Sequence, residues 1–208
     1  MDIAIIGRGA LGTTLGEAWM TKGHRVTYGS RDPAGAKVGT ATSAGDNGMV
    51  RSISEAVRDA RVVVFAVPWN GAADAVKAAG RLAGKIVIDP INAFTPELGL
   101  SIGHTTSVAE QIAQAAPGAK VVKAFNTLGV ANVKSLRFGD QVASGFICGD
   151  DDDAKATVAL LSKDVGFDVV DCGPLVNARA LEPLAMLWGQ LAFPLGLGPN
   201  IAFKLLRR

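Results

Sequence analysis

Residues 2–12 read Asp-Ile-Ala-Ile-Ile-Gly-Arg-Gly-Ala-Leu-Gly, an apolar run that leads directly into a Gly-x-Gly-x-x-Gly loop. Apolar residues then recur at helical spacing, at Leu11, Leu15, Ala18 and Trp19. Gly23 ends this pattern, and a second apolar run begins at Arg25. The order predicts a strand, a glycine loop, a helix and a second strand.

Each glycine of the loop has a mechanical task in a dinucleotide-binding unit. Gly7 permits the tight turn, Gly9 lets the backbone approach a pyrophosphate, and Gly12 allows the helix to pack closely on the strand. The start of the helix supplies unpaired N–H groups and partial positive charge for phosphates. A tight turn with no ligand is the alternative, but the context favours a cofactor loop made of Gly7, Arg8, Gly9, Ala10, Leu11 and Gly12.

The end of the second predicted strand indicates NADP in preference to NAD. NAD-binding folds usually place a carboxylate there for the ribose 2′-hydroxyl, whereas this chain has Ser30 and Arg31. An arginine can bind a 2′-phosphate as a fork, and a serine can donate a hydrogen bond. Arg8 and Lys37 add positive charge, while Asp32 would favour NAD if its carboxylate faced the ribose.

Short apolar runs recur along the chain and alternate with helical segments. We expect strands at Ile3–Ile6, Arg25–Tyr28, Val62–Val67, Lys85–Asp89, Lys120–Ala124, Gly145–Cys148 and Phe167–Asp171. Capping-box patterns at 52–55 and 107–110 mark helix starts, and Gly166 closes a helix that begins at Asp152. The alternation predicts an α/β fold of the Rossmann type, with a doubly wound, mainly parallel sheet. We expect the strand order 3-2-1-4-5-6, with two further strands at one edge.

The composition changes after Cys172, where β-branched runs give way to segments rich in Leu and Ala. We therefore divide the chain into a dinucleotide-binding domain, residues 1–172, and a short C-terminal helical segment, residues 173–208. The apolar stretch Leu181–Gly198 is interrupted by polar residues and a proline, so we predict a buried helix and no membrane span. This segment, with Trp188, could roof an acceptor site or form a dimer contact, and we expect a homodimer.

Charge and cysteine usage narrow the class of partner. The 208 residues carry 21 basic and 19 acidic side chains, a net charge of +2, so no broad field attracts nucleic acid or an anionic membrane. Only two cysteines occur, and the N-terminus lacks the pattern of a secretion signal. We therefore expect a cytoplasmic protein whose partner is a small molecule. If NADP is the cofactor, that small molecule is an electron acceptor.

Ligands of such sheets bind outside the carboxyl ends of the strands. After the Val62–Val67 run, Val67, Pro68 and Trp69 are placed to flank the dinucleotide. After the next two runs, we assign Asn92, Phe125, Asn126 and Thr127 to the nicotinamide and a second substrate. Polar residues in such loops also satisfy backbone groups, so a purely structural role remains open.

No catalytic acid or base is expected, because hydride passes directly between carbon atoms. The two histidines, His24 and His104, lie before a strand and in a loop, and we assign neither to catalysis. The acidic run 150–153 opens a helix, where carboxylates complement the helix dipole, so we predict no metal site.

Several segments together resemble the NADPH-dependent deazaflavin-coenzyme reductase family. They are residues 7–12, 29–31, 67–69, 122–127, 173–175 and 178–179, and the resemblance covers nearly the whole chain. It implies hydride transfer between NADP and a 5-deazaflavin, with relatives among pyrroline-carboxylate reductases and the cytoplasmic domains of transmembrane ferric reductases. The family's 2′-phosphate residues map onto Ser30 and Arg31, and its backbone-binding loop onto residues 8–12. Arg8 and Ala10 replace a small polar residue and an amide of many members.

We therefore predict an NADP-dependent oxidoreductase with a deazaflavin or flavin as the second substrate. An imine reductase of the pyrroline-carboxylate type is one alternative, although the C-terminal region is short for that family's helical dimerisation domain. A redox-sensing module that binds NADP without turnover is the other.

Overall fold

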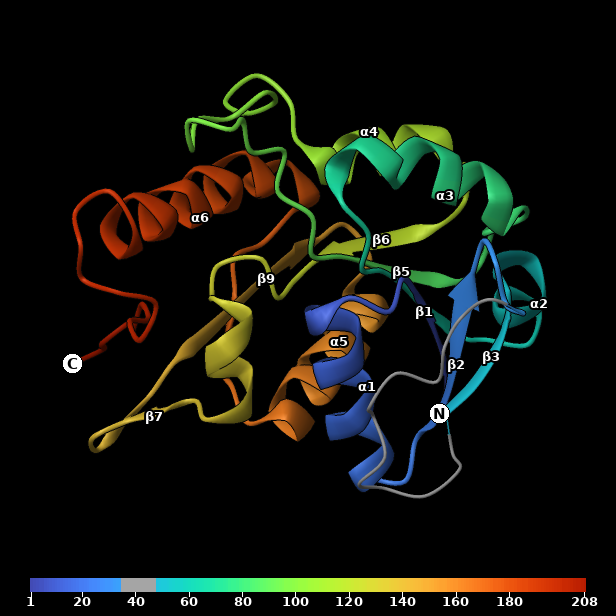
Figure 1. Cartoon of the computed structure of the whole chain (residues 1–208), viewed down its shortest axis with the longest axis horizontal. Helices are drawn as coiled ribbons and strands as arrows, with labels where there is room; N and C mark the ends of the chain where they lie inside the picture. Colours follow the sequence, from blue (N-terminus) through green and yellow to red (C-terminus); the bar gives the residue numbers. More distant parts are fainter. Residues whose placement is uncertain (35–47) are drawn as a thin grey trace.

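An eight-stranded sheet forms the centre of the molecule in the computed structural model, which describes residues 1–34 and 48–208 (Figure 1). Its strands are β1 (Asp2–Ile6), β2 (Arg25–Ser30), β3 (Gly48–Ser52), β4 (Val62–Phe65), β5 (Ile86–Asp89), β6 (Lys120–Lys123), β9 (Ser144–Gly149) and β10 (Asp168–Asp171). The strand order is β10-β9-β6-β5-β4-β1-β2-β3. The predicted order 3-2-1-4-5-6, extended by two strands at one edge, is confirmed.

All neighbouring strands are parallel except β6 and β9, which pair antiparallel at Val122–Gly149 and Lys123–Cys148. A hairpin of β7 (Arg137–Phe138) and β8 (Gln141–Val142) lies between them in the chain, with no helical crossover to return the chain to the parallel direction. The edge strand β3 was not among the strands predicted from apolar runs. It is short, and its residue Met49 is 52% exposed, so it lacks a clear apolar pattern.

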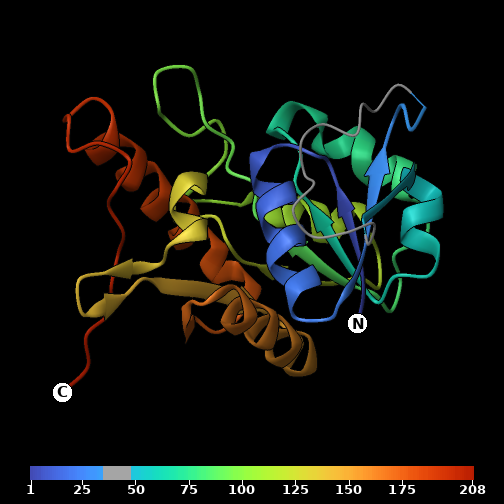
Figure 2. The same ribbon diagram turned by 60° about the horizontal axis from the view of Figure 1, so that its bottom comes forward.

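Helices cover both faces of the sheet (Figures 1 and 2). They are α1 (Ala10–Thr21), α2 (Ile53–Arg58), α3 (Ala72–Ala79), α4 (Val108–Ala115), α5 (Asp152–Val165) and α6 (Ala178–Ala192), with short 3-10 turns η1 (Trp69–Gly71), η2 (Val130–Lys134) and η3 (Leu175–Asn177). Helices α1 and α5 pack on one face, and α2, α3, α4 and α6 contribute to the apolar core on the other. Both predicted serine caps form, since the hydroxyls of Ser52 and Ser107 accept the backbone N–H groups of Glu55 and Glu110.

The apolar C-terminal stretch differs from the prediction of one buried helix. Helix α6 ends at Ala192, and Pro194 and two glycines with positive φ, Gly196 and Gly198, follow it. Leu195 and Leu197 are 67% and 61% exposed. Among the described residues, no helix has the length and apolar character needed to cross a lipid bilayer.

Candidate functional site

The loop between β1 and α1 has a conformation that requires glycine at two positions. Gly7 has a φ of +103°, and a Cβ there would lie 2.3 Å from the carbonyl oxygen of Ala66, just after β4. A Cβ on Gly12 would lie 2.5 Å from the carbonyl oxygen of Gly7. The tight turn and the close helix–strand packing expected of these two residues are therefore present.

Gly9 differs from both, since a Cβ at this position would have no neighbour within 4 Å. It is the N-cap of α1, and no side chain caps this helix. The first N–H groups of α1 thus lack a side-chain acceptor and are suited to hydrogen-bond an anionic ligand. The open space at Gly9 fits the close approach of a pyrophosphate.

A cavity of about 690 Å³ adjoins this loop at the carboxyl ends of β1, β2 and β4. Its lining comprises Ile6, Gly7, Arg8, Gly9, Thr13, Gly29, Ser30, Arg31, Asp32, Ile53, Ala66, Val67, Pro68, Asn70, Gly71, Asp74 and Ala75. A cavity of about 590 Å³ lies at the opposite end of β1 and β2. Since ligands of such sheets bind outside the carboxyl ends of the strands, the first cavity is the candidate dinucleotide site.

Seven of the predicted cofactor residues line this cavity, namely Gly7, Arg8, Gly9, Ser30, Arg31, Val67 and Pro68. Of the other five, the four that the structure describes are not among its lining residues. Leu11 and Trp69 pack against the two apolar cores, Gly12 is buried, and Ala10 is exposed on the first turn of α1. Lys37 lies outside the described residues. Thr13, Asn70 and Asp74 line the cavity although the sequence did not single them out.

At the end of the cavity where we predict a 2′-phosphate, Arg31 is exposed, and the Ser30 hydroxyl accepts the backbone N–H of Asp32 at 3.1 Å. The same hydroxyl donates to the Asp32 carbonyl at 3.0 Å, so it must rotate to serve a phosphate. The Arg8 guanidinium lies over the Tyr28 ring, 5.6 Å from its centroid. Two arginines therefore stand at the rim of one cavity.

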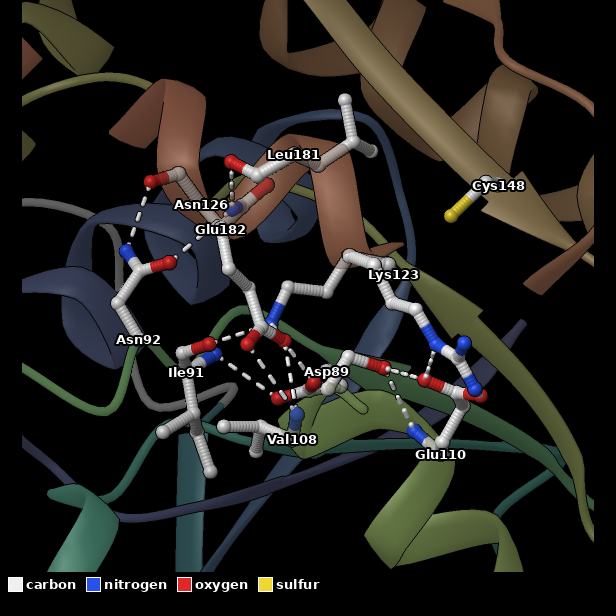
Figure 3. Close-up of polar contacts among 12 residues, drawn as sticks. Asp89, Ile91, Asn92, Val108, Glu110, Lys123, Asn126, Cys148, Leu181 and Glu182 are labelled. Atoms are coloured by element: carbon white, nitrogen blue, oxygen red, sulfur yellow. Dashed lines mark hydrogen bonds and ion pairs between the residues drawn. The ribbon is translucent and has the colours of Figure 1, made fainter. Parts of the chain in front are cut away.

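The amides of Asn92 and Asn126, two predicted substrate residues, are bonded to each other (Figure 3). The Asn92 amide donates to the backbone carbonyl of Asn126 at 2.9 Å, and the Asn126 amide donates to Oδ1 of Asn92 at 3.1 Å. Asn126 also donates to the carbonyl of Leu181 in α6 at 2.9 Å. Its own Oδ1 is buried and has no hydrogen-bond partner among the described residues.

Phe125 and Thr127 have a different environment from the one expected. The Phe125 ring is 8% exposed and packs between Trp19 and Phe167, with centroid distances of 5.9 and 5.8 Å. Thr127 is 6% exposed. Phe125 has a φ of +64°, which is an uncommon backbone conformation for a residue with a side chain. The chain turns at this residue while its ring enters the core. The Phe125 ring therefore anchors the loop and does not face the cavity.

Three charged residues meet beneath this loop. Lys123 at the end of β6, Asp89 at the end of β5 and Glu182 in α6 are each fully buried. Burial raises the pKa of the Glu182 carboxyl, and the Lys123 ammonium opposes this shift. A sequence signal existed, since a charge inside an apolar strand or helix rarely remains buried without a partner.

Two further polar features lie near the network. Arg179 donates to both carboxylate oxygens of Glu110, at 2.9 and 2.6 Å, and holds the pKa of that carboxyl below its usual value. Burial raises the pKa of the Cys148 thiol to about 12, so this sulfur is kept as an unreactive thiol.

Comparison with known proteins identifies the family of the chain. Residues 2–93 match the family described as NADP oxidoreductase, coenzyme F420-dependent. The crystal structure of a candidate F420-dependent NADP reductase from Arthrobacter sp. FB24 superimposes with a TM-score of 0.91 at 33% identity, each chain being covered completely.

Two curated relatives are longer than this chain. Metalloreductase STEAP3 of Rattus norvegicus is 33% identical over 189 residues, which are 89% of this chain and 37% of the relative. The F420-dependent NADP reductase of Methanocaldococcus jannaschii is 27% identical over 157 residues, 72% of this chain and 66% of the relative. Because the Arthrobacter chain matches from end to end and residues 2–93 match the family itself, this chain belongs to the family of coenzyme F420-dependent NADP oxidoreductases.

Proposed function

We propose that the protein transfers hydride between NADPH and a deazaflavin or flavin-type acceptor. The observation that carries the proposal is the single cavity shared by the open Gly9 turn and by Ser30 and Arg31. The names of the family and of the archaeal relative support a deazaflavin as the acceptor. The name of the rat relative, a metalloreductase, makes a ferric chelate the acceptor to compare with it.

The residues of the cavity fit a bound NADPH, which supplies the hydride. Gly9 leaves room for the pyrophosphate, and the first turn of α1 provides N–H donors for it. Arg31 offers charge to a 2′-phosphate, and Val67 and Pro68 line the same cavity. Because hydride passes directly from carbon to carbon, these residues bind and orient, and none has to move a proton.

Rapid mixing under anaerobic conditions tests the proposal directly. NADPH is combined with the protein and, separately, with a deazaflavin, FMN, FAD and a ferric chelate, and the loss of NADPH absorbance is followed. We expect fast oxidation with a deazaflavin or flavin, and slower oxidation when NADH replaces NADPH. Tight binding of NADPH without oxidation by any acceptor would contradict the proposal and favour an NADP-sensing module.

Cyclic imines should be tested as acceptors in the same experiment, because the sequence also allows an imine reductase. Turnover with an imine alone would replace the deazaflavin or flavin as the acceptor. Oxidation by the ferric chelate alone would assign the protein to metal reduction.

A further inference from the structure

Three buried charges connect the ends of two strands to α6 (Figure 3). The Lys123 ammonium donates to Asp89 at 2.9 Å, to Glu182 at 2.7 Å and to the backbone carbonyl of Ile91. All three residues are 0% exposed. Each of the three ammonium hydrogens therefore has an acceptor, and no water is needed to complete the set.

The two carboxylates extend the network to a further element. Glu182 accepts the backbone N–H of Val108, the first residue of α4, at 2.9 Å. Asp89 accepts the backbone N–H of Ile91 at 2.8 Å. Through Asp89 and Glu182, one lysine thus fixes the end of β5, the end of β6, the start of α4 and the second turn of α6 relative to one another.

Stability alone does not account for this arrangement. Removing three charges from water costs several kcal/mol per ion, and apolar side chains of similar volume often stabilise such a site as well or better. The charged groups restrict the relative orientation of the elements that carry them, because hydrogen bonds depend on angle as well as distance. The network sets the position of α6 over the strand ends more sharply than apolar contacts would.

The same segments carry the pair of amides described above. Asn92 follows Ile91, Asn126 lies three residues after Lys123, and the carbonyl that Asn126 binds belongs to Leu181, next to Glu182. Two contacts of Lys123 therefore end next to the Asn92–Asn126 pair or its partner, since Ile91 precedes Asn92 and Glu182 follows Leu181. The strained Phe125 lies between Lys123 and Asn126 and leaves that stretch of chain little freedom to relax.

We propose that Lys123 is a positioning residue which, through Asp89 and Glu182, holds the Asn92–Asn126 pair in the orientation that binds the electron acceptor. The proposal rests on the proposed function, because it assigns these amides to the acceptor and not to the dinucleotide. Neither amide lines the cavity that contains the glycine loop. The proposal therefore predicts that loss of the network changes acceptor binding and leaves dinucleotide binding unaffected.

The first test variant is Glu182→Gln, which keeps the shape of the side chain and removes its charge. We expect the KM for the acceptor to rise about tenfold or more, because a small misplacement of a positioned group has effects of this size. The dissociation constant of NADPH should stay unchanged. A variant that is merely less well folded would instead lose kcat in proportion to its active fraction, which titration with NADPH measures, and its KM would not move.

Glu110→Gln is the matched control. It breaks the ion pair between α4 and α6, the same two helices, without touching Lys123 or the amide pair. We expect it to leave the KM for the acceptor unchanged. An equal rise in both variants would overturn the proposal, because it would assign the effect to helix packing in general.

A triple variant removes all three charges together: Asp89→Asn, Lys123→Met and Glu182→Met. It leaves no single buried charge unpaired, so it controls for misfolding from that cause. If it folds by circular dichroism and binds NADPH, its acceptor KM should rise as in Glu182→Gln. Wild-type KM in either folded variant would overturn the positioning role. Failure of wild-type protein to oxidise NADPH with any acceptor would instead overturn the proposed function, and the positioning role with it.

Discussion

Gly9 is the N-cap of α1 and Gly12 lies in its first turn, yet an added methyl group meets different surroundings at each. At Gly12 it would lie 2.5 Å from a backbone oxygen, which cannot move aside without shifting the β1–α1 turn. We expect Gly12→Ala to lower the free energy of unfolding by about 1–3 kcal/mol, as overpacking does. Urea unfolding measures the change.

Gly9→Ala is the counterpart, since nothing lies within 4 Å of the added Cβ. It should leave the unfolding midpoint near that of the wild type and weaken NADPH binding, because the methyl group occupies the space assigned to the pyrophosphate. Unchanged NADPH affinity in folded Gly9→Ala would show that the pyrophosphate binds elsewhere.

Arg31 determines the choice between the two dinucleotides in our proposal. We expect Arg31→Ala to weaken NADPH binding by about 1.5–3 kcal/mol, the contribution of a hydrogen bond to a charged group, and to leave NADH binding nearly unchanged. Isothermal titration with both dinucleotides measures the difference.

Arg81→Ala is a suitable control, since Arg81 is an exposed arginine away from the cavity. It should change neither affinity. Equal losses of NADPH and NADH affinity in Arg31→Ala would remove the basis for the NADP assignment at this position.

At the scale of elements, Glu110 and Arg179 connect α4 to α6 in a partly exposed ion pair. Because the pKa of Glu110 is lowered in the folded protein, its contribution to stability is present above the usual value of 4.5 and is lost as the pH falls through the lowered value. Exposed pairs contribute about 0.2–1 kcal/mol, which corresponds to a few degrees at most in Tm.

We therefore expect Glu110→Gln to lower Tm slightly at pH 7 and to match the wild type in strong acid. Scanning calorimetry across this pH range checks the prediction. A difference in Tm that grew toward acid would contradict the assigned direction of the pKa shift.

At the scale of the whole molecule, NADPH should stabilise the fold by mass action. A ligand present at one hundred times its Kd adds about 2.7 kcal/mol, which raises Tm by roughly 5–10 °C for a chain of this size. NADH at the same concentration should give a smaller rise, and Arg31→Ala should abolish the difference. Identical shifts with both dinucleotides would contradict selection for NADP.

Local patterns determined most of the fold. The 2–12 stretch, the alternating runs and the serine caps depend on neighbours in the chain. They therefore indicated α1, α2, α4 and α5, all but one strand of the main sheet, and the strand order. Gly7, Arg8 and Gly9 line one cavity together with Ser30 and Arg31, because strand ends of a known order meet at a known edge.

The tertiary structure decided what depends on contacts between distant residues. Phe125 turns into the core because Trp19 and Phe167 are there to receive it, and Trp69 packs against the core instead of lining the cavity. Lys123, Asp89 and Glu182 stand up to 93 positions apart in the sequence, Asp89 to Glu182, and no local pattern pairs them. The sequence by itself determined a dinucleotide-binding sheet with an NADP-type loop, whereas the buried charges beside it exist as a unit only once folding brings two strand ends and α6 together.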